Sequence, residues 1–524
     1  MKLCQASELE ALIAATPDGE VCRLERREYY IRRRVELRGR CDLVVEGNGA
    51  LIVTEYNNSA DYKRSADAFL IEDCRGLTLR NLVIDTDAPT NVTATVEAVN
   101  AEAETITLLV DSAFSMTGNE IFMAFGSVDE ENSFDYRLHH YEPHPDPDIV
   151  TLVQNEILLA KTYAGAPYTY LGNNRFAVKI PAQRLTNLKG GERVCIRHTV
   201  YGPSVVVIRH SDDTVLENIT MHAAPGMGVM VLPRCHNLTV DGLRMVCREG
   251  SDMLMSCNCD GIHMTGLTGR FVLRNSVFDG LGDDALNVHS TAGTVSAVDM
   301  AAHTARCHYS KKMPDGELAA AWCRKGDRIR IFDPKNVECV GEMTVVDFCR
   351  GVLVFSDLCG RLEEGFCLQN MAFAPSCLVE HCEVRNTRSR GLIFQTEDVE
   401  VKNCTFFGMS ASAIKATVAF DYWYEVGPVD GLYIHDNRFV KNAFRGASLR
   451  PVLINAPKMA DKTTVPYGLH KNVRIEKNTF EGTPTAYIEV QGTDGVCIHD
   501  NVFLDREAKD SICLVNCRDV SVQV

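Results

Sequence analysis

One short pattern recurs along this chain and limits the folds that it can adopt. Two apolar residues flank a variable one, two polar residues follow, and an Asn, Ser or Cys then stands two places before a Phe or another apolar residue, as in residues 271–278. Copies begin at Leu77, Leu238, Phe271, Cys377, Val399, Leu432, Val473 and Val496, with a related segment at Thr214. Closely spaced copies begin 24, 33, 22, 33 and 23 residues apart.

The alternation inside each copy predicts a β-strand. The Asn position marks a bend, where the side chain can bond backbone groups and stack on its counterpart one coil away. Strand repeats of roughly 20 to 30 residues are typical of a solenoid. Leucine-rich repeats would need a helical segment in every unit, and these repeats have none. The sequence therefore predicts an all-β fold, a right-handed parallel β-helix.

Two long segments interrupt the repeat, from about residue 88 to 200 and from about 291 to 373. They share a similar stretch, at residues 191–197 and 326–332, and both contain alternation typical of antiparallel strands. We expect each to form an inserted β-barrel-like domain. Residues 5–16 are expected to form a short helix that covers the open end of the solenoid. The predicted divisions are the cap and first coils (1–87), the first insertion (88–200), coils with candidate catalytic acids (201–290), the second insertion (291–373) and the C-terminal coils (374–524).

Charge and hydropathy limit the partners of this chain of 524 residues. The formal net charge is −16 without a Lys/Arg cluster, which argues against nucleic acid and against a polyanionic polysaccharide. No apolar run approaches the roughly 18 residues of a membrane span. A neutral or lightly charged ligand fits this composition better.

The cysteines and the first ten residues bear on the compartment. The 21 cysteines are odd in number, and several occupy apolar strand positions, as Cys377, Cys382, Cys404 and Cys497 do. This distribution favours buried thiols in a reducing compartment over disulfides or zinc sites. Acidic residues also stand where a secretory signal would place its apolar region. The sequence therefore predicts a cytoplasmic protein.

Three carboxylates recur at the interval of one coil. Asp283 and Asp284 follow Asp260 by 23 and 24 residues, and coils of a β-helix stack about 4.8 Å apart. Placing like charges together costs energy that a solvated turn would avoid. Repulsion and burial should keep one carboxyl protonated near neutral pH while the others stay ionised. Hydrolysis of a glycosidic bond needs this division between acid and base.

The spacing leaves the stereochemical course open. Carboxylates stacked at about 5 Å suit a retaining enzyme, whereas diverging side chains could reach the roughly 6.5 to 9.5 Å of inverting enzymes. Strand alternation would also send Asp283 and Asp284 to opposite faces. Both can face one cleft only if the backbone bends, which Gly282 makes plausible.

Five segments of the chain, in order, resemble glycoside hydrolase family 110, the α-1,3-galactosidases that cleave the blood-group B galactose. They are residues 224–228, 260–263, 282–289, 389–391 and 422–427. The resemblance extends from about residue 40 onward and includes two inserted barrels. It implies an exo-acting, inverting α-galactosidase that needs no metal or other cofactor. Its substrate would be an oligosaccharide or glycan with a terminal α-galactose.

The resemblance also implies roles for single residues. Asp283 would be the general acid, while Asp260 and Asp284 would place and deprotonate the water. Substrate contacts are implied for Asn287, His289, Arg390, Trp423 and Glu425. Trp423 or Tyr424 would stack on the apolar face of galactose. Val426 departs from the family pattern, where a small polar residue is expected, and a homo-oligomer is compatible with the sequence.

Other functions remain open at this point. A pectin-type β-helix hydrolase also carries an Asp and an Asp-Asp pair one coil apart, but it needs cationic groups for uronate. Neither a Gly-His-Gly nor an Arg-x-Lys segment follows Asp284. A β-helix lyase would need a basic residue to take the proton. A carbohydrate-binding solenoid without catalysis differs in being inactive on a chromogenic α-galactoside.

Overall fold

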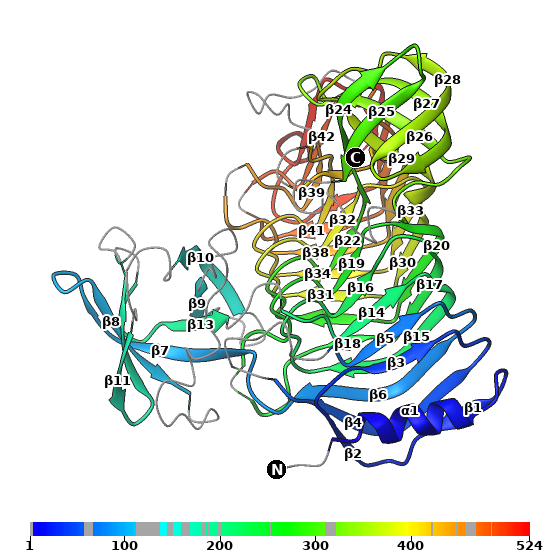
Figure 1. Ribbon diagram of the computed structural model, residues 1–524. Helices are drawn as coiled ribbons and strands as arrows, with labels where there is room; N and C mark the ends of the chain where they lie inside the picture. The colour runs from blue at the N-terminus through cyan, green and yellow to red at the C-terminus, as the bar shows by residue number, and fades with distance from the viewer. Residues whose placement is uncertain are drawn as a thin grey trace.

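A stack of parallel coils forms the body of the molecule (Figure 1). The computed structural model describes residues 4–56, 67–111, 137–143, 150–158, 168–180, 185, 188–197, 202–251, 253–309, 321–420, 423–446, 448–455, 468–483 and 485–523. Each coil contributes short strands that pair in parallel with the coils before and after it. The predicted fold, a parallel β-helix with two inserted antiparallel domains, is confirmed. Both insertions were expected to be β-barrel-like, and the second is a closed barrel whereas the first is a seven-stranded sheet.

The strands form three parallel ladders. The first contains β1 (Val21–Arg23), β4 (Val44–Thr54), β6 (Thr78–Thr86), β15 (Asp212–Met221), β17 (Cys235–Asp241), β20 (Leu267–Arg274), β30 (Ser376–Glu380), β33 (Val399–Lys402), β37 (Asp430–His435), β40 (His470–Glu476), β43 (Thr493–His499) and β46 (Arg518–Gln523). The second joins β2 (Glu28–Ile31) to the far ends of β4, β6 and β15, and continues through β18 (Arg244–Met245), β21 (Val277–Asp279), β31 (Glu383–Arg385), β34 (Thr405–Phe407), β38 (Arg438–Val440), β41 (Thr479–Glu481) and β44 (Val502–Phe503).

The third ladder carries the candidate site. It runs through β3 (Val35–Arg38), β5 (Phe69–Glu72), β14 (Val206–Arg209), β16 (Val229–Val231), β19 (Ile262–Met264), β22 (Leu286–Val288), β32 (Leu392–Phe394), β35 (Ile414–Ala416), β39 (Val452–Ile454), β42 (Ile488–Gln491) and β45 (Ile512–Val515). Apolar side chains from all three ladders point inward and form one long core.

The Asn and Phe positions of the repeat stack along this core. Asn437 donates from its side chain to Asn478, and Asn478 donates to Asn501, both at 3.0 Å. The three amides are buried. One strand further on, the rings of Phe439 and Phe480 stack with centroids 4.6 Å apart. The expected stacking of Asn on its counterpart one coil away is confirmed.

The first insertion is a seven-stranded antiparallel sheet that projects from one side of the coils (Figure 1). Its strands are β7 (Asn91–Asn100), β8 (Thr105–Val110), β9 (Arg137–Pro143), β10 (Val150–Leu158), β11 (Tyr168–Gly172), β12 (Arg175–Lys179) and β13 (Arg193–Arg197). The second insertion is a closed barrel of β24 (Gly293–Asp299), β25 (Thr304–Tyr309), β26 (Arg328–Asp333), β27 (Glu338–Cys349), β28 (Val352–Gly360) and β29 (Cys367–Asn370). The similar stretches at 191–197 and 326–332 are strands of the two insertions, β13 and β26. The residue limits of the five divisions of the chain given above, from 1–87 to 374–524, stay a prediction.

The remaining elements are short. Helix α1 (Ala6–Ala15) buries Ala6, Leu9 and Ile13 against the core beside β2 and β3, which confirms the expected helix over residues 5–16. The other elements are β23 (Ser290–Thr291), β36 (Glu425–Val426) and the 3-10 turns η3 (Met371–Phe373) and η4 (Ala508–Asp510). In the described part of the chain, no helix combines the length and the apolar character that crossing a membrane requires.

The cysteines are free thiols. Cys377 is buried in β30 and Cys497 is half-buried in β43, as the repeat predicts. Cys382 and Cys404 are buried too, but at the bends just before β31 and β34 and not in strands.

Candidate active site

The three aspartates lie together at the start of two neighbouring strands. Asp260 precedes β19, Asp283 and Asp284 precede β22, and these strands pair with His263 opposite Asn287. The backbone N–H of Asp284 donates to Oδ1 of Asp260 at 3.2 Å. Oxygens of Asp260 and Asp283 lie within 4.8 Å of each other. The offset of one coil thus brings these carboxyls together as expected.

Glycines allow the two turns to approach so closely. A Cβ at Gly282 would lie 2.5 Å from the carbonyl oxygen of Asn258, and one at Gly261 would lie 2.6 Å from that of Ala285. Any side chain at these positions would push the coils apart, which explains a glycine beside each acid.

Asp284 is held by Arg390. The guanidinium donates from Nε to Oδ1 at 2.8 Å and from a terminal nitrogen to Oδ2 at 2.9 Å, a bidentate pair. Burial raises the pKa of Asp284 to about 7, against the opposing effect of Arg390. This carboxyl can therefore exchange a proton near neutral pH.

Asp283 has different surroundings. Burial would raise its pKa, but Arg388, Arg390 and Arg197 outweigh burial, and the pKa of Asp283 is lowered. A terminal nitrogen of Arg388 lies 3.2 Å from Oδ1. The side chain of Asp283 is 19% exposed, against 6% for Asp260 and 3% for Asp284. Asp283 is thus the carboxyl that loses its proton most readily and the one most accessible to a ligand.

Asp260 pairs with His263, the last residue of the segment 260–263. Its Oδ2 lies 2.6 Å from Nδ1 of His263. Burial raises the pKa of Asp260, although His263 acts in the opposite direction. Burial would lower the pKa of His263, but the bond to Asp260 raises it. Among the three aspartates, Asp260 and Asp284 therefore bind a proton more readily than Asp283 does.

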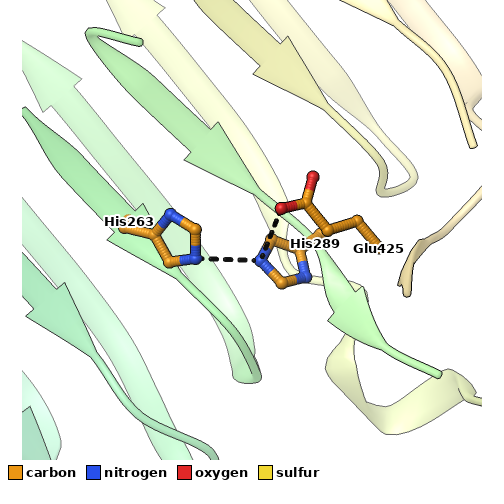
Figure 2. A group of neighbouring side chains, drawn as sticks. All are labelled: His263, His289 and Glu425. Carbon is orange, nitrogen blue, oxygen red and sulfur yellow. Dashed lines mark hydrogen bonds and ion pairs between the residues drawn. The ribbon is translucent and has the colours of Figure 1, made fainter. Parts of the chain in front are cut away.

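Glu425 brings a third segment to the site. Strand β36 pairs antiparallel with β23, so that Glu425 lies opposite Thr291. Glu425 accepts from Gln395 at 3.1 Å and from Asn287 at 3.4 Å. It also lies 3.8 Å from Nε2 of His289, as Figure 2 shows. Burial would raise the pKa of Glu425, but the surrounding histidines and Arg390 lower it. Burial lowers the pKa of His289 to about 4, so this imidazole is neutral at pH 7.

The remaining predicted residues sit on the same segment. Trp423 is 49% exposed, whereas Tyr424 is buried, so only Trp423 offers a ring face to a sugar. Val426 is buried opposite Ser290 and packs in an apolar cluster that includes Phe420. The side chain of Val426 therefore packs the segment in place, which explains why this residue is apolar.

Three contributors escaped the sequence reasoning. Arg388 stands two residues before Arg390 and binds Asp283, a proximity that the repeat alone does not indicate. Arg197 lies in the first insertion and donates to the carbonyl oxygens of Asn258 and Gly282. His263 belongs to the segment 260–263 that carries the resemblance, but the sequence assigned it no role.

The chain is similar along most of its length to known sugar hydrolases. It is 26% identical over 479 residues to alpha-1,3-galactosidase A of Bacteroides fragilis. This match covers 89% of this chain and 74% of that protein. Identity to alpha-1,3-galactosidase B of Bacteroides thetaiotaomicron is 22% over 500 residues, covering 92% and 78%. No protein-family model matches the chain.

Among solved structures, the family 28 exopolygalacturonase of Yersinia enterocolitica aligns with a TM-score of 0.45 and 11% identity, over 100% of this chain and 76% of that one. The structural alignment carries no argument about function, so the comparison rests on the similarity in sequence. It confirms the resemblance indicated by the five segments: over most of its length the chain is similar in sequence to α-1,3-galactosidases, the activity of glycoside hydrolase family 110.

Proposed function

We propose that this protein is a glycoside hydrolase that removes terminal α-galactose, in particular α-1,3-linked galactose, from an oligosaccharide or glycan. The observation that carries the proposal is the cluster of Asp260, Asp283 and Asp284 on adjacent coils, in a chain related to α-1,3-galactosidases. Closely placed carboxyls of unequal proton affinity can supply both the acid and the base of glycosidic hydrolysis.

Asp283 is the proposed proton donor, because it is the carboxyl that a glycosidic oxygen can reach. Its pKa is lowered in the ligand-free site, by arginines that outweigh burial, so the proton must come from a neighbour. Asp260 has a pKa raised by burial and an oxygen within 4.8 Å of Asp283. A proton moved from Asp260 to Asp283 would leave one acid and one base.

This division of roles closes the catalytic cycle. Asp283 gives its proton to the leaving oxygen, and Asp260, aided by Asp284, takes a proton from the attacking water. The products leave with Asp260 protonated and Asp283 ionised, which is the order of proton affinity in the ligand-free site. No external proton is needed to restore the starting state.

Inversion and exo action are the proposed course and mode. The separation of Asp260 and Asp283, within 4.8 Å, is shorter than the roughly 6.5 to 9.5 Å usual for inverting enzymes. The water is therefore proposed to bind beside these two carboxyls, between Asp260 and Asp284. Retention, which a short separation favours, is the alternative that the product anomer decides.

The proposed sugar contacts are Asn287, His289, Glu425 and the ring of Trp423. Arg390 was also implied as a sugar contact, but in the ligand-free site its guanidinium binds Asp284 through a bidentate pair. Arg388 in turn binds Asp283. Because both arginines already pair with carboxyls of the protein, the site favours a neutral galactoside over the carboxylate of a uronate.

The test is a panel of α-1,3-, α-1,4- and α-1,6-linked galactosides, with galacturonides included and the product anomer followed by NMR. We expect galactose from the α-1,3 linkage, released as the β-anomer. Activity on galacturonides alone would replace this proposal by the pectin-type one. Sugar binding without hydrolysis of any linkage would leave a binding solenoid.

Asp283→Asn is expected to lower turnover by about 10²- to 10⁴-fold, because it removes the general acid while preserving shape. Asp241→Asn is the matched control, since Asp241 pairs with Arg274 on the outer surface. Circular dichroism would establish that both variants are folded. Unchanged turnover in Asp283→Asn would remove Asp283 from the mechanism.

A further inference from the structure

Two imidazoles and a carboxylate meet beside the catalytic acids. Nε2 of His263 lies 3.1 Å from Nε2 of His289, and the latter lies 3.8 Å from Oε1 of Glu425 (Figure 2). All three donor atoms lie within 4.8 Å of one another. They come from β19, from the residue after β22 and from β36, so three separate segments aim donors at one point.

This donor set matches the preference of divalent transition metals. Two His nitrogens and one Glu oxygen hold Zn²⁺ in open sites, at about 2.0 to 2.2 Å per bond. With bonds of about 2.05 Å, two nitrogens 3.1 Å apart subtend an angle of roughly 100° at the metal, close to a tetrahedral angle. The nitrogens therefore need little movement to bind one ion.

The groups behind the donors orient them for binding. Oδ2 of Asp260 lies 2.6 Å from Nδ1 of His263, so an ionised Asp260 holds the proton of the neutral imidazole on Nδ1 and leaves the Nε2 lone pair pointing toward His289. Such a carboxylate behind a metal-binding histidine also raises the basicity of the ligand. Gln395 and Asn287 donate their amide hydrogens to Glu425 and hold its carboxylate in place.

Two buried acceptor atoms beside Glu425 also point to a ligand at this site. Asn287 is 4% exposed and Gln395 is fully buried, yet Oδ1 of Asn287 and Oε1 of Gln395 have no hydrogen-bond partner among the described residues. Buried carbonyl oxygens without a partner are costly. A hydrated cation at the neighbouring donors would supply water hydrogens to such acceptors.

We propose that His263, His289 and Glu425 form a binding site for a divalent transition-metal ion of the Zn²⁺ class, and that the bound ion inhibits the hydrolase. Inhibition rests on the proposed function, whereas binding does not. His289 and Glu425 are proposed sugar contacts, and His263 is the partner of Asp260. An ion on these three residues and a galactoside would therefore compete for the same groups.

Binding is tested on the full chain after removal of metal by a chelator. Titration with Co²⁺ is expected to give the visible d–d bands of a four-coordinate nitrogen and oxygen site, at one ion per chain, and Zn²⁺ is expected to displace it. Glu425→Gln preserves shape but removes the charged ligand, and His289→Gln removes a nitrogen donor. Each is expected to weaken Co²⁺ binding at least about tenfold.

The control variant is His499→Gln, which changes the separate cluster of Glu476, Cys497 and His499 and should leave Co²⁺ binding unchanged. Binding that persists in both site variants would overturn the proposal. Intense thiolate-to-cobalt bands would do the same, because they would assign the ion to cysteines.

Inhibition is a separate measurement. Zn²⁺ is expected to raise the apparent KM of wild type for an α-galactoside without changing kcat, reversibly on adding EDTA. Metal binding without hydrolysis of any galactoside would reject the proposed function alone. Hydrolysis that Zn²⁺ leaves unaffected would reject the inhibitory role.

Discussion

Three aspartates of the same chemistry differ in proton affinity here because different groups surround each one. Asp284 and Asp260 are the more deeply buried, and burial raises the pKa of each. Asp283 is nearer the surface and close to arginines, which lower its pKa against the effect of burial. Neighbouring carboxyls can thus hold one proton in a defined place.

Arg390→Gln tests how the pKa of Asp284 is set. Burial raises this pKa to about 7 and Arg390 opposes that rise, so removing Arg390 should raise the pKa further. If ionised Asp284 assists the base, kcat/KM falls as pH drops through this pKa. The acidic limb of the kcat/KM profile should therefore move upward by about one pH unit or more.

The comparison variant for this measurement is Arg274→Gln, which removes an outer-surface partner of Asp241 and should leave the limb in place. A limb that stays put, or moves to lower pH, in Arg390→Gln would show that Asp284 does not set it.

At the scale of elements, the first insertion is anchored on the catalytic turns. In the pairing of β13 with β7, Arg197 lies opposite Asn91. Asn91 donates to the side-chain oxygen of Asn258 at 2.9 Å, and Arg197 donates to the carbonyl oxygens of Asn258 and Gly282. Asn258 and Gly282 immediately precede the turns that carry Asp260 and Asp283. The root of the insertion therefore positions both carboxyls.

Arg197→Met is expected to lower kcat about ten- to hundredfold with a smaller change in KM, because small displacements of reacting groups are costly. The pKa of Asp283 should also rise, since Arg197 is one of the charges that lower it. A pH profile separates this effect from a loss of folded protein. Arg175→Met, which breaks an ion pair with Glu97 on the exposed sheet, is the control. Equal effects of the two variants would make Arg197 a structural residue only.

At the scale of the whole molecule, stability comes from contacts between successive coils. Each coil packs mainly on the coils before and after it, so the free energy of unfolding is approximately a sum of such interfaces. Asn437, Asn478 and Asn501 connect three coils by side-chain hydrogen bonds. A destabilised coil should therefore weaken the solenoid as a whole.

His470 makes the stability of the molecule depend on pH. It is fully buried, accepts from the N–H of Val429 at 3.1 Å and lies 3.2 Å from the carbonyl oxygen of Asn455. Burial lowers the pKa of His470 to about 4. As pH falls below about 6.5, the imidazole of His470 binds a proton in the unfolded chain but stays neutral in the folded chain until about pH 4. This lowers the free energy of unfolding, by about 3 kcal/mol at pH 4.

Urea unfolding of wild type and His470→Gln at several pH values checks this contribution. The loss of stability between about pH 6.5 and pH 4 should be smaller in the variant, whatever its stability at neutral pH. His499→Gln, at a half-buried outer position, should keep the slope of wild type. Parallel slopes for wild type and His470→Gln would contradict the assignment.

The coils and the place of the acids could be predicted because both follow from local periodicity. Alternating residues assign each strand its inward side, and an offset of 23 to 24 residues sets Asp260 beside Asp283 and Asp284. The two insertions could be recognised because residues 88–200 and 291–373 lack this periodicity. The helix over residues 5–16 could also be placed from its sequence.

The groups that give the site its charge and shape could not be predicted in this way. Arg197 reaches Asn258 from another domain, and Glu425 reaches Asn287 from a segment 138 residues later in the chain. Such contacts depend on how the insertion and the returning segment pack, which no local pattern encodes. The sequence by itself thus determined the solenoid and the line of three aspartates. Only the tertiary structure decided which of them is ionised, because proton affinity depends on burial and on charges that distant segments bring to the site.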